Sequence, residues 1–175
     1  MSFFSRLFGK SDAKRETLRP LWHEIVAVSR ESEWYAECEV ADSVEGRFDM
    51  ISLVLALVLM RMESDETLAP DTALLTELFV ADMDRQLRET GVGDLMVGKH
   101  MGKLMSVLGG RLGALREAMA KADDADLAAA LQRNVTLAEG DTTHVPLALA
   151  RRVRALHDEL NGQENAALLA GKLRA

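Results

Sequence analysis

The stretch MISLVLALVLM, at residues 50–60, is the longest almost purely apolar segment of the chain. Asp49 and Arg61 bound it, and its eleven residues are too few to cross a membrane as a helix, which takes about 20. A short helix that is apolar on all sides is typical of the centre of a globular protein. We therefore expect residues 50–60 to form a buried helix, with the other segments packed around it.

Leucine and alanine dominate the rest of the chain as well. Together they supply 51 of the 175 residues, whereas valine, isoleucine and threonine supply 23, so helices are favoured over sheet. A hydrophobic fraction of 48% beside 28% charged residues excludes wholesale disorder, and the length suits one domain. We predict an all-α fold, a compact multi-helix bundle with a hydrophobic cleft, over residues 16–175. Residues 1–15 are expected to be a flexible, basic, amphipathic N-terminus.

Hydrophobic periodicity, prolines and capping residues predict where the helices lie. Pro20, Pro70 and Pro146 each suit the beginning of a helix, because the first turn does not need their missing N–H group. The expected helices cover residues 20–32, 34–40, 42–61, 70–91, 99–121, 123–135, 146–160 and 164–173. Gly109 and Gly110 leave open whether residues 99–121 form one helix or two, because an interior glycine costs about 1 kcal/mol.

Patterns for catalysis and metal binding are incomplete. His23 and Glu24 lack the second histidine of a zinc-protease helix, because Ala27 occupies that position. The glycines of GVGDLM, at residues 91–96, follow a predicted helix instead of the strand that a dinucleotide-binding turn requires. Cys38 is the only cysteine, which excludes an internal disulfide. We predict a protein that is not an enzyme and has no catalytic residue, metal or cofactor.

The N-terminus combines apolar and basic residues. Two interpretations are open: a short amphipathic segment that binds a membrane surface, or a frayed end of the chain. The start of the chain lacks the long apolar stretch of a secretory signal, so we expect a cytoplasmic protein. If the amphipathic segment binds a membrane, the protein is peripheral on the inner face of the cytoplasmic membrane. A net charge of −7 argues against binding to DNA. The apolar residues of this N-terminal segment are Phe3, Phe4, Leu7 and Phe8, and its basic residues are Arg6, Lys10, Lys14 and Arg15.

Nine methionines are more than a chain of this length usually has. Flexible, polarisable methionine side chains can line a groove that adapts to apolar partners of differing shape, but they also fill ordinary cores. Met96, Met101 and Met105 gather beside the glycine turn, and Met60 and Met83 lie on the preceding helices. The sequence leaves both readings, groove and core, open.

Two blocks of sequence carry a family resemblance. Residues 78–111, LFVADMDRQLRETGVGDLMVGKHMGKLMSVLGGR, resemble the signature region of the ubiquinol-cytochrome c chaperone family, above all in the turn GVGDL. Residues 34–62, with Trp34-Tyr35, the step Gly46-Arg47-Phe48 and the long apolar helix, are similar to a second block of that family. The absence of a long targeting extension suggests a bacterial-type member.

The resemblance implies an α-helical chaperone that binds newly made cytochrome b and assists assembly of the cytochrome bc1 complex. A transmembrane client needs an exposed apolar groove, so we expect one between the hairpin 78–105 and residues 47–62. The residues expected to bind the client are Phe48, Met60, Phe79, Met83, Met96, Lys99, Met101, Lys103 and Met105. Mitochondrial relatives bind the ribosome near the nascent chain, and the ribosome and the membrane surface are further candidate partners of the N-terminus.

Structural roles are expected for Arg47, Asp82, Asp84, Gly91, Gly93, Asp94 and Arg111. Gly91 and Gly93 would shape the turn, and Asp94 would cap the helix that follows it. Arg47 is expected to pair with Asp82 or Asp84, which would also pair within their own helix with Arg85 and Arg88 respectively. Arg111 is expected beside the groove, together with Lys99 and Lys103. The alternative function is a peripheral membrane or ribosome-associated adaptor that uses the N-terminus and the arginines at 151–154.

Overall fold

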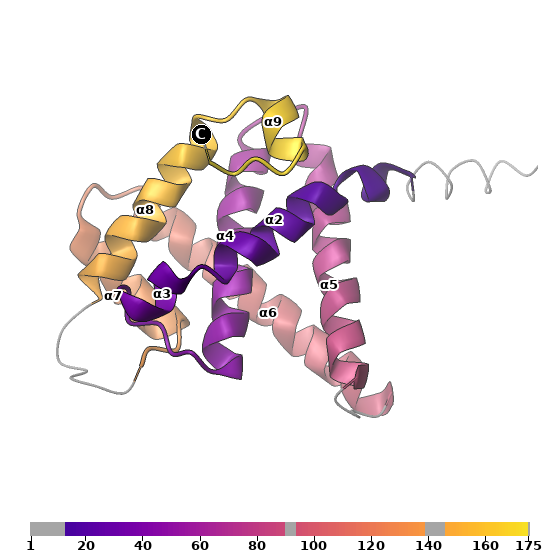
Figure 1. The fold of residues 1–175 in the computed structure, drawn as a ribbon, viewed down its shortest axis with the longest axis horizontal. Helices are drawn as coiled ribbons and strands as arrows, with labels where there is room; N and C mark the ends of the chain where they lie inside the picture. Colours follow the sequence, from indigo (N-terminus) through magenta and orange to yellow (C-terminus); the bar gives the residue numbers. More distant parts are fainter. Residues whose placement is uncertain (1–12, 90–93, 139–145, 175) are drawn as a thin grey trace, which may run out of the picture.

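The computed structural model describes residues 13–89, 94–138 and 146–174, and in these ranges the fold is all-α, as predicted. Residues 13–17 are helical and lead into the first long helix. The named elements are α2 (Arg19–Ser29), α3 (Ser32–Ala36), α4 (Val44–Glu63), the 3-10 turn η1 (Ala69–Asp71), α5 (Thr72–Glu89), α6 (Asp94–Met119), α7 (Asp124–Asn134), α8 (Leu147–Asn161) and α9 (Asn165–Leu169). Figure 1 shows their arrangement.

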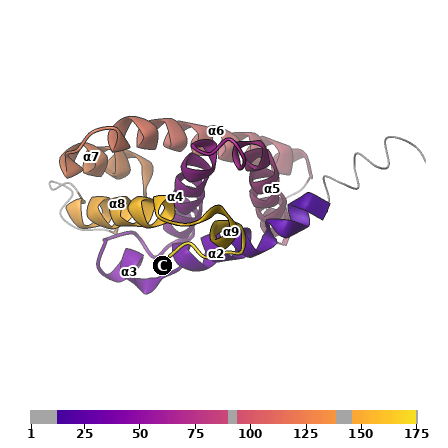
Figure 2. The ribbon, with the colours of Figure 1, turned by 90° about the horizontal axis from the view of Figure 1, so that it is seen from above.

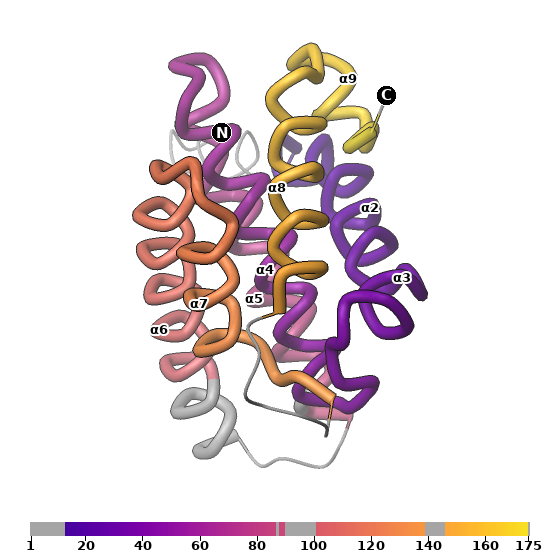
Figure 3. The backbone as a smooth tube through the Cα atoms, turned by 90° about the vertical axis from the view of Figure 1, so that its left-hand side faces the viewer, coloured from indigo at the N-terminus to yellow at the C-terminus, as the bar shows by residue number. Residues whose placement is uncertain are grey.

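Helix α4 lies at the centre, which confirms the prediction made from its apolar stretch. It contacts α2, α5, α6 and α8, and Figure 2 shows α6 above it, α2 below it, and α8 and α5 to its left and right. Residues 51–59 are all buried, none of them more than 5% exposed. Figure 3 shows α6, α7 and α8 side by side along one flank. Within the described residues, no helix is long and apolar enough to cross a membrane.

The helix ends follow local chemistry. Ser43 begins α4, where its hydroxyl oxygen accepts a hydrogen bond from the Gly46 N–H, and Asp123 caps α7 through the Ala125 N–H. Pro20 occupies the first turn of α2, as expected. At the other end of α4, the Arg61 guanidinium donates to the carbonyl oxygens of Leu160, in the last turn of α8, and of Gln163, just after this helix. These contacts fix the C-terminal segment against the central helix.

Several boundaries needed the structure to define them. Helix α6 begins at Asp94 instead of residue 99, and α9 ends at Leu169 instead of residue 173. Helix α6 runs without a break through Gly109 and Gly110, so a single helix is the correct alternative. The predicted helix at 34–40 is wrong in its second half, because α3 ends at Ala36. Glu39 there has a φ of 62° and turns the chain, and Val40 instead forms an isolated antiparallel bridge with Leu137. Short-range periodicity cannot reveal a pairing that spans nearly a hundred residues.

Only glycine fits at position 46, in the first turn of α4. Gly110 serves as a matched control in a test of this packing. A Cβ atom at this position would lie 2.0 Å from the carbonyl oxygen of Ala41, whereas one at Gly110 would meet nothing within 4 Å. We expect Gly46→Ala to lower the free energy of unfolding by about 2–3 kcal/mol through overpacking. Gly110→Ala should raise it by about 0.5–1 kcal/mol, because alanine is the better helix former. Urea unfolding measures both, and equal effects of the two substitutions would contradict this packing.

Candidate functional site

An open groove of about 810 Å³ lies between α5, α6 and the C-terminal end of α4. Its floor is formed by Leu59 and Leu108, which are almost fully buried, and its walls are mostly aliphatic or small. A concave apolar surface of this size is a typical binding site. Its lining consists of Arg15, Leu59, Glu63, Thr72, Ala73, Thr76, Glu77, Val80, Ala81, Asp84, Met101, Met105, Leu108, Gly109 and Leu112.

The walls are single faces of two amphipathic helices. On α5 the lining residues recur at three- and four-residue steps from Ala73 to Asp84, and on α6 they do so from Met101 to Leu112. Each face spans eleven residue steps, or about 16 Å at 1.5 Å per residue. The groove is therefore long enough for about three turns of a helix.

Met101 and Met105 are the sequence-predicted residues that line the groove. Met105 is 39% exposed, and among the large hydrophobic side chains described only Val44 and Leu147 are also classed as exposed. Met101 is half-buried and packs against the core below it. The methionines thus serve both purposes left open by the sequence, since Met50, Met62 and Met83 fill the core while Met101 and Met105 face the groove.

Other predicted client contacts lie inside the protein. Phe79 and Met83 are buried, so neither side chain is available to a partner in this structure, and their expected surface position is wrong. The Phe79 ring lies edge-on to Trp22, with ring centroids 6.0 Å apart, and 6.3 Å from Phe48. Phe48 and Met60 are half-buried and pack against the core. The helical periodicity of α5 shows which residues share a face. It does not show which face packs against the core.

The polar predictions have mixed outcomes. Asp82 pairs with Arg85, and Asp84 pairs with Arg88 at 2.9 Å, as expected from their helical spacing. Arg47 does not reach either aspartate. Its Nε donates instead to Asp42 at 2.6 Å, because Asp42 lies just before α4 and much closer in the chain.

Several predictions lie outside the described residues. Gly91 and Gly93 are among them, and so are the side chains of Met96 and Lys99. Asp94 is the first residue of α6, but its capping role stays a prediction. Lys103 is exposed on α6, so it is accessible to a partner.

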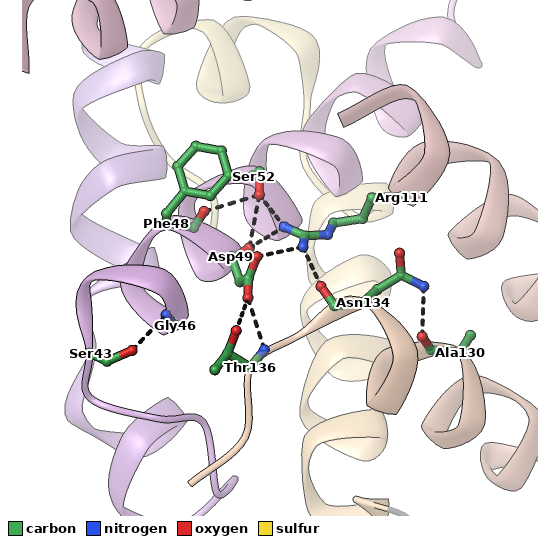
Figure 4. A network of polar contacts seen from close by, with 9 residues as sticks. All are labelled: Ser43, Gly46, Phe48, Asp49, Ser52, Arg111, Ala130, Asn134 and Thr136. Carbon is green, nitrogen blue, oxygen red and sulfur yellow. Dashed lines mark hydrogen bonds and ion pairs between the residues drawn. The ribbon is translucent and has the colours of Figure 1, made fainter. Parts of the chain in front are cut away.

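Arg111 is buried, which corrects its expected place beside the groove. Its side chain is 3% exposed, and it joins α4, α6 and the end of α7 in one polar network (Figure 4). One terminal nitrogen donates to the Asp49 carbonyl oxygen at 2.8 Å and to the Ser52 hydroxyl; the other lies 2.7 Å from the Asp49 carboxylate and also donates to the Asn134 carbonyl oxygen. A planar guanidinium suits this task, because it makes several hydrogen bonds in fixed directions.

The Asp49 carboxylate extends the network to a further segment. Its second oxygen accepts from the Thr136 N–H at 2.8 Å and from the Thr136 hydroxyl at 2.7 Å. One buried ion pair thus ties the first turns of α4 to α6 and to the chain after α7. Sequence reasoning found Arg111 as part of the motif but missed these partners, because 62 residues separate Arg111 from Asp49.

Comparisons with known proteins show the family of the chain and a solved structure of similar fold. The sequence profile of the family described as ubiquinol-cytochrome C chaperone matches residues 36–175, from the end of α3 to the C-terminus. The chain belongs to the ubiquinol-cytochrome C chaperone family. It is also similar to a solved structure, the Cbp3 homolog from Brucella abortus, with 34% identity over 97% of this chain and 94% of that chain and a TM-score of 0.76. Curated proteins gave no match.

Family membership confirms the resemblance carried by GVGDL and its neighbours. It also directs attention from chemistry to binding surfaces, because the family is a chaperone family. In the described parts of the chain, no three His, Cys, Asp or Glu residues gather in a way that could hold a metal ion. The groove is therefore the candidate functional site of the described chain.

The arginines at 151–154, which the adaptor hypothesis needs as a basic surface, are paired with acids. Arg152 is 11% exposed, and its guanidinium lies 4.9 Å above the Trp34 ring and 2.9 Å from Glu33. Arg151 and Arg154 lie 3.6 Å and 2.9 Å from the same carboxylate, Asp124. The expected basic strip is thus largely neutralised within the fold.

Removal of Arg111 tests the buried network. Arg111→Ala leaves the Asp49 carboxylate without its cation, so we expect the free energy of unfolding to fall by about 3–5 kcal/mol. The double variant, Asp49→Ala with Arg111→Ala, should lower the free energy of unfolding by clearly less than the sum of the two single changes. The reason is that each single change already removes the interaction between the two side chains. Urea unfolding of the three variants measures this coupling, and strictly additive losses would argue against a direct interaction.

Cys38 tests the packing of the α3 segment. Burial, helped by the negative charge of Glu33, raises the pKa of its thiol from 9.0 to about 11. At pH 8 the folded protein should therefore hold about 100-fold less thiolate than the unfolded chain and react correspondingly slowly with iodoacetamide. Alkylation rates with and without urea check this, and fast labelling of the folded protein would show that Cys38 is accessible.

Proposed function

We propose that this chain is an assembly chaperone that binds newly made cytochrome b in the groove between α4, α5 and α6 and so assists assembly of the cytochrome bc1 complex. The observation that carries the proposal is an apolar groove on a member of the ubiquinol-cytochrome C chaperone family. Binding alone accounts for this activity, and no chemical step is required of the protein.

The dimensions of the groove suit part of a transmembrane segment. A membrane-spanning helix of about 20 residues is about 30 Å long, whereas the two walls offer about 16 Å. The groove would therefore cover about half of one such helix and leave the other half for a second partner or the membrane. A helix lying in an apolar groove is a common mode of peptide recognition.

The wall residues favour tolerance over a close fit to one sequence. Met101 and Met105 lie on α6, and their side chains can adopt several shapes around a guest. Opposite them, Ala73, Thr76 and Ala81 are short and leave room for a bulky side chain to approach α5. Such a surface suits a client whose transmembrane helices differ from one another in sequence.

Charges at the edge would orient the client. Glu77 and Asp84 lie on the α5 wall. Lys103 is exposed on α6 but is not part of the groove lining, because it lies about 200° around the helix from Met101, which faces the groove. Charged groups at the rim of an interface chiefly set the register and the rate of encounter, and they add little to affinity. The client's charged loops are thus guided, while its apolar segments supply the binding energy.

Met105 and Leu147 offer a matched pair for a test, because they are 39% and 38% exposed. Met105→Glu places a charge in the groove and should reduce crosslinking to cytochrome b at least tenfold, whereas Leu147→Glu, on α8, should leave it unchanged. Each variant is expressed in a host whose own gene is deleted, and bc1 content is read from cytochrome b haem absorbance. Equal rescue by both variants would place the client elsewhere, and normal bc1 content after deletion would remove the proposed function.

A further inference from the structure

We infer that the helix bound in the groove carries two basic residues seven positions apart, which pair with Glu77 and Asp84 on the α5 wall. The inference rests on the proposed function for the identity of the client, and it specifies which kind of client segment the groove selects. The floor and the α6 wall suit an apolar face, whereas the α5 wall is charged. The expected occupant is therefore an apolar helix with one basic edge.

The two walls of the groove differ in charge. Among the described lining residues, three are acidic, Glu63, Glu77 and Asp84, whereas Arg15 alone is basic. Negative charge along one wall attracts a basic edge of the bound helix and so fixes the rotation of that helix about its own axis. The lining residues that α6 contributes are all uncharged: Met101, Met105, Leu108, Gly109 and Leu112.

The spacing of the two carboxylates on α5 matches the period of a helix. Glu77 and Asp84 are seven residues apart, so they lie within about 20° of each other around α5 and about 10.5 Å apart along its axis. A second helix that lies along this wall has the same period. Two basic residues seven positions apart on it would therefore face both carboxylates at once, whichever way the helix runs.

Both carboxylates can accept further hydrogen bonds. The Glu77 side chain is 56% exposed, and the terminal nitrogen of Arg15 lies 4.0 Å from it, which is too far for a hydrogen bond. Asp84 is 34% exposed and accepts from the Arg88 Nε at 2.9 Å. Because one carboxylate offers about four acceptor positions, each of the two has room for a donor from the bound helix.

The end of a membrane-spanning segment has the required chemistry. Such segments are apolar along their length, and the loops that flank them on the cytoplasmic side are rich in lysine and arginine. The groove accepts about three turns of helix, enough to cover the last apolar turns together with the first basic residues beyond them. Exposed ion pairs add modestly to affinity, so the α5 wall selects among apolar segments and the apolar contacts supply most of the binding energy.

Binding of synthetic helical peptides to the purified full-length chain tests the inference. Three fluorescent peptides share one apolar face and carry two lysines seven positions apart, two lysines five positions apart, or two glutamines. The two lysine peptides have the same net charge, so only the spacing distinguishes them. By fluorescence anisotropy, we expect the seven-spaced peptide to bind about threefold more tightly than the five-spaced one and about tenfold more tightly than the glutamine peptide. In 1 M NaCl, where the Debye length is about 3 Å, these differences should vanish.

Neutral substitutions locate the interaction on the α5 wall. Glu77→Gln combined with Asp84→Asn should make the two lysine peptides bind equally. The matched control is Glu45→Gln combined with Glu117→Gln, which removes the same charge from exposed residues outside the groove lining and should keep the threefold preference. Glu77→Lys combined with Asp84→Lys should reverse the preference, so that a peptide with two glutamates seven positions apart binds best.

Equal binding of the two lysine peptides to the unchanged chain, or a preference that survives loss of both carboxylates, would overturn the inference. So would the absence of peptide binding, including the case in which the chain elutes as a dimer because a second copy covers the groove. Tight binding of all three peptides would reject the basic edge but leave the groove as an apolar binding site. The bc1 content of the deletion host tests the proposed function separately.

Discussion

Burial of the central part of α4, residues 51–59, is the constraint on which the rest of the structure depends. A helix with residues 51–59 covered on every side can exist in water only if other helices surround it, and α2, α5, α6 and α8 do so. Burial of a large apolar side chain is worth about 1.5–3 kcal/mol, so this helix contributes substantially to stability. The groove arises where α5 and α6 diverge near the C-terminal end of α4, with Leu59 at its floor.

Long arginine side chains fix the arrangement that apolar packing leaves adjustable. Arg111 joins the first turns of α4 to α6 and to the end of α7, and Arg61 joins the last turn of α4 to the segment after α8. Because each satisfies carbonyl oxygens from distant parts of the chain, a shifted helix would leave buried polar groups without partners. The two ends of the central helix are thereby held in register with their neighbours.

Sequence reasoning succeeded where the signal is local. The apolar run at 50–60 and the prolines place most helices correctly, and the family resemblance is carried by the GVGDL region. It failed where the outcome depends on residues far apart in the chain. Phe79 is predicted to contact the client, but the neighbouring rings of Trp22 and Phe48 show that its face of α5 is buried. Arg47 is the opposite case, because its partner is Asp42, only five residues away, and not the distant Asp82 or Asp84.

The central claim is that the exposed wall between α5 and α6 receives an apolar helix of the client. Hydrogen–deuterium exchange of the purified chaperone, with and without a peptide copied from a cytochrome b transmembrane segment, measures this most directly. Binding in the groove predicts slower exchange in residues 72–84 and 101–112 and little change in α7 and α8. Protection confined to α7 and α8, or absent at peptide concentrations that saturate binding, would contradict the account.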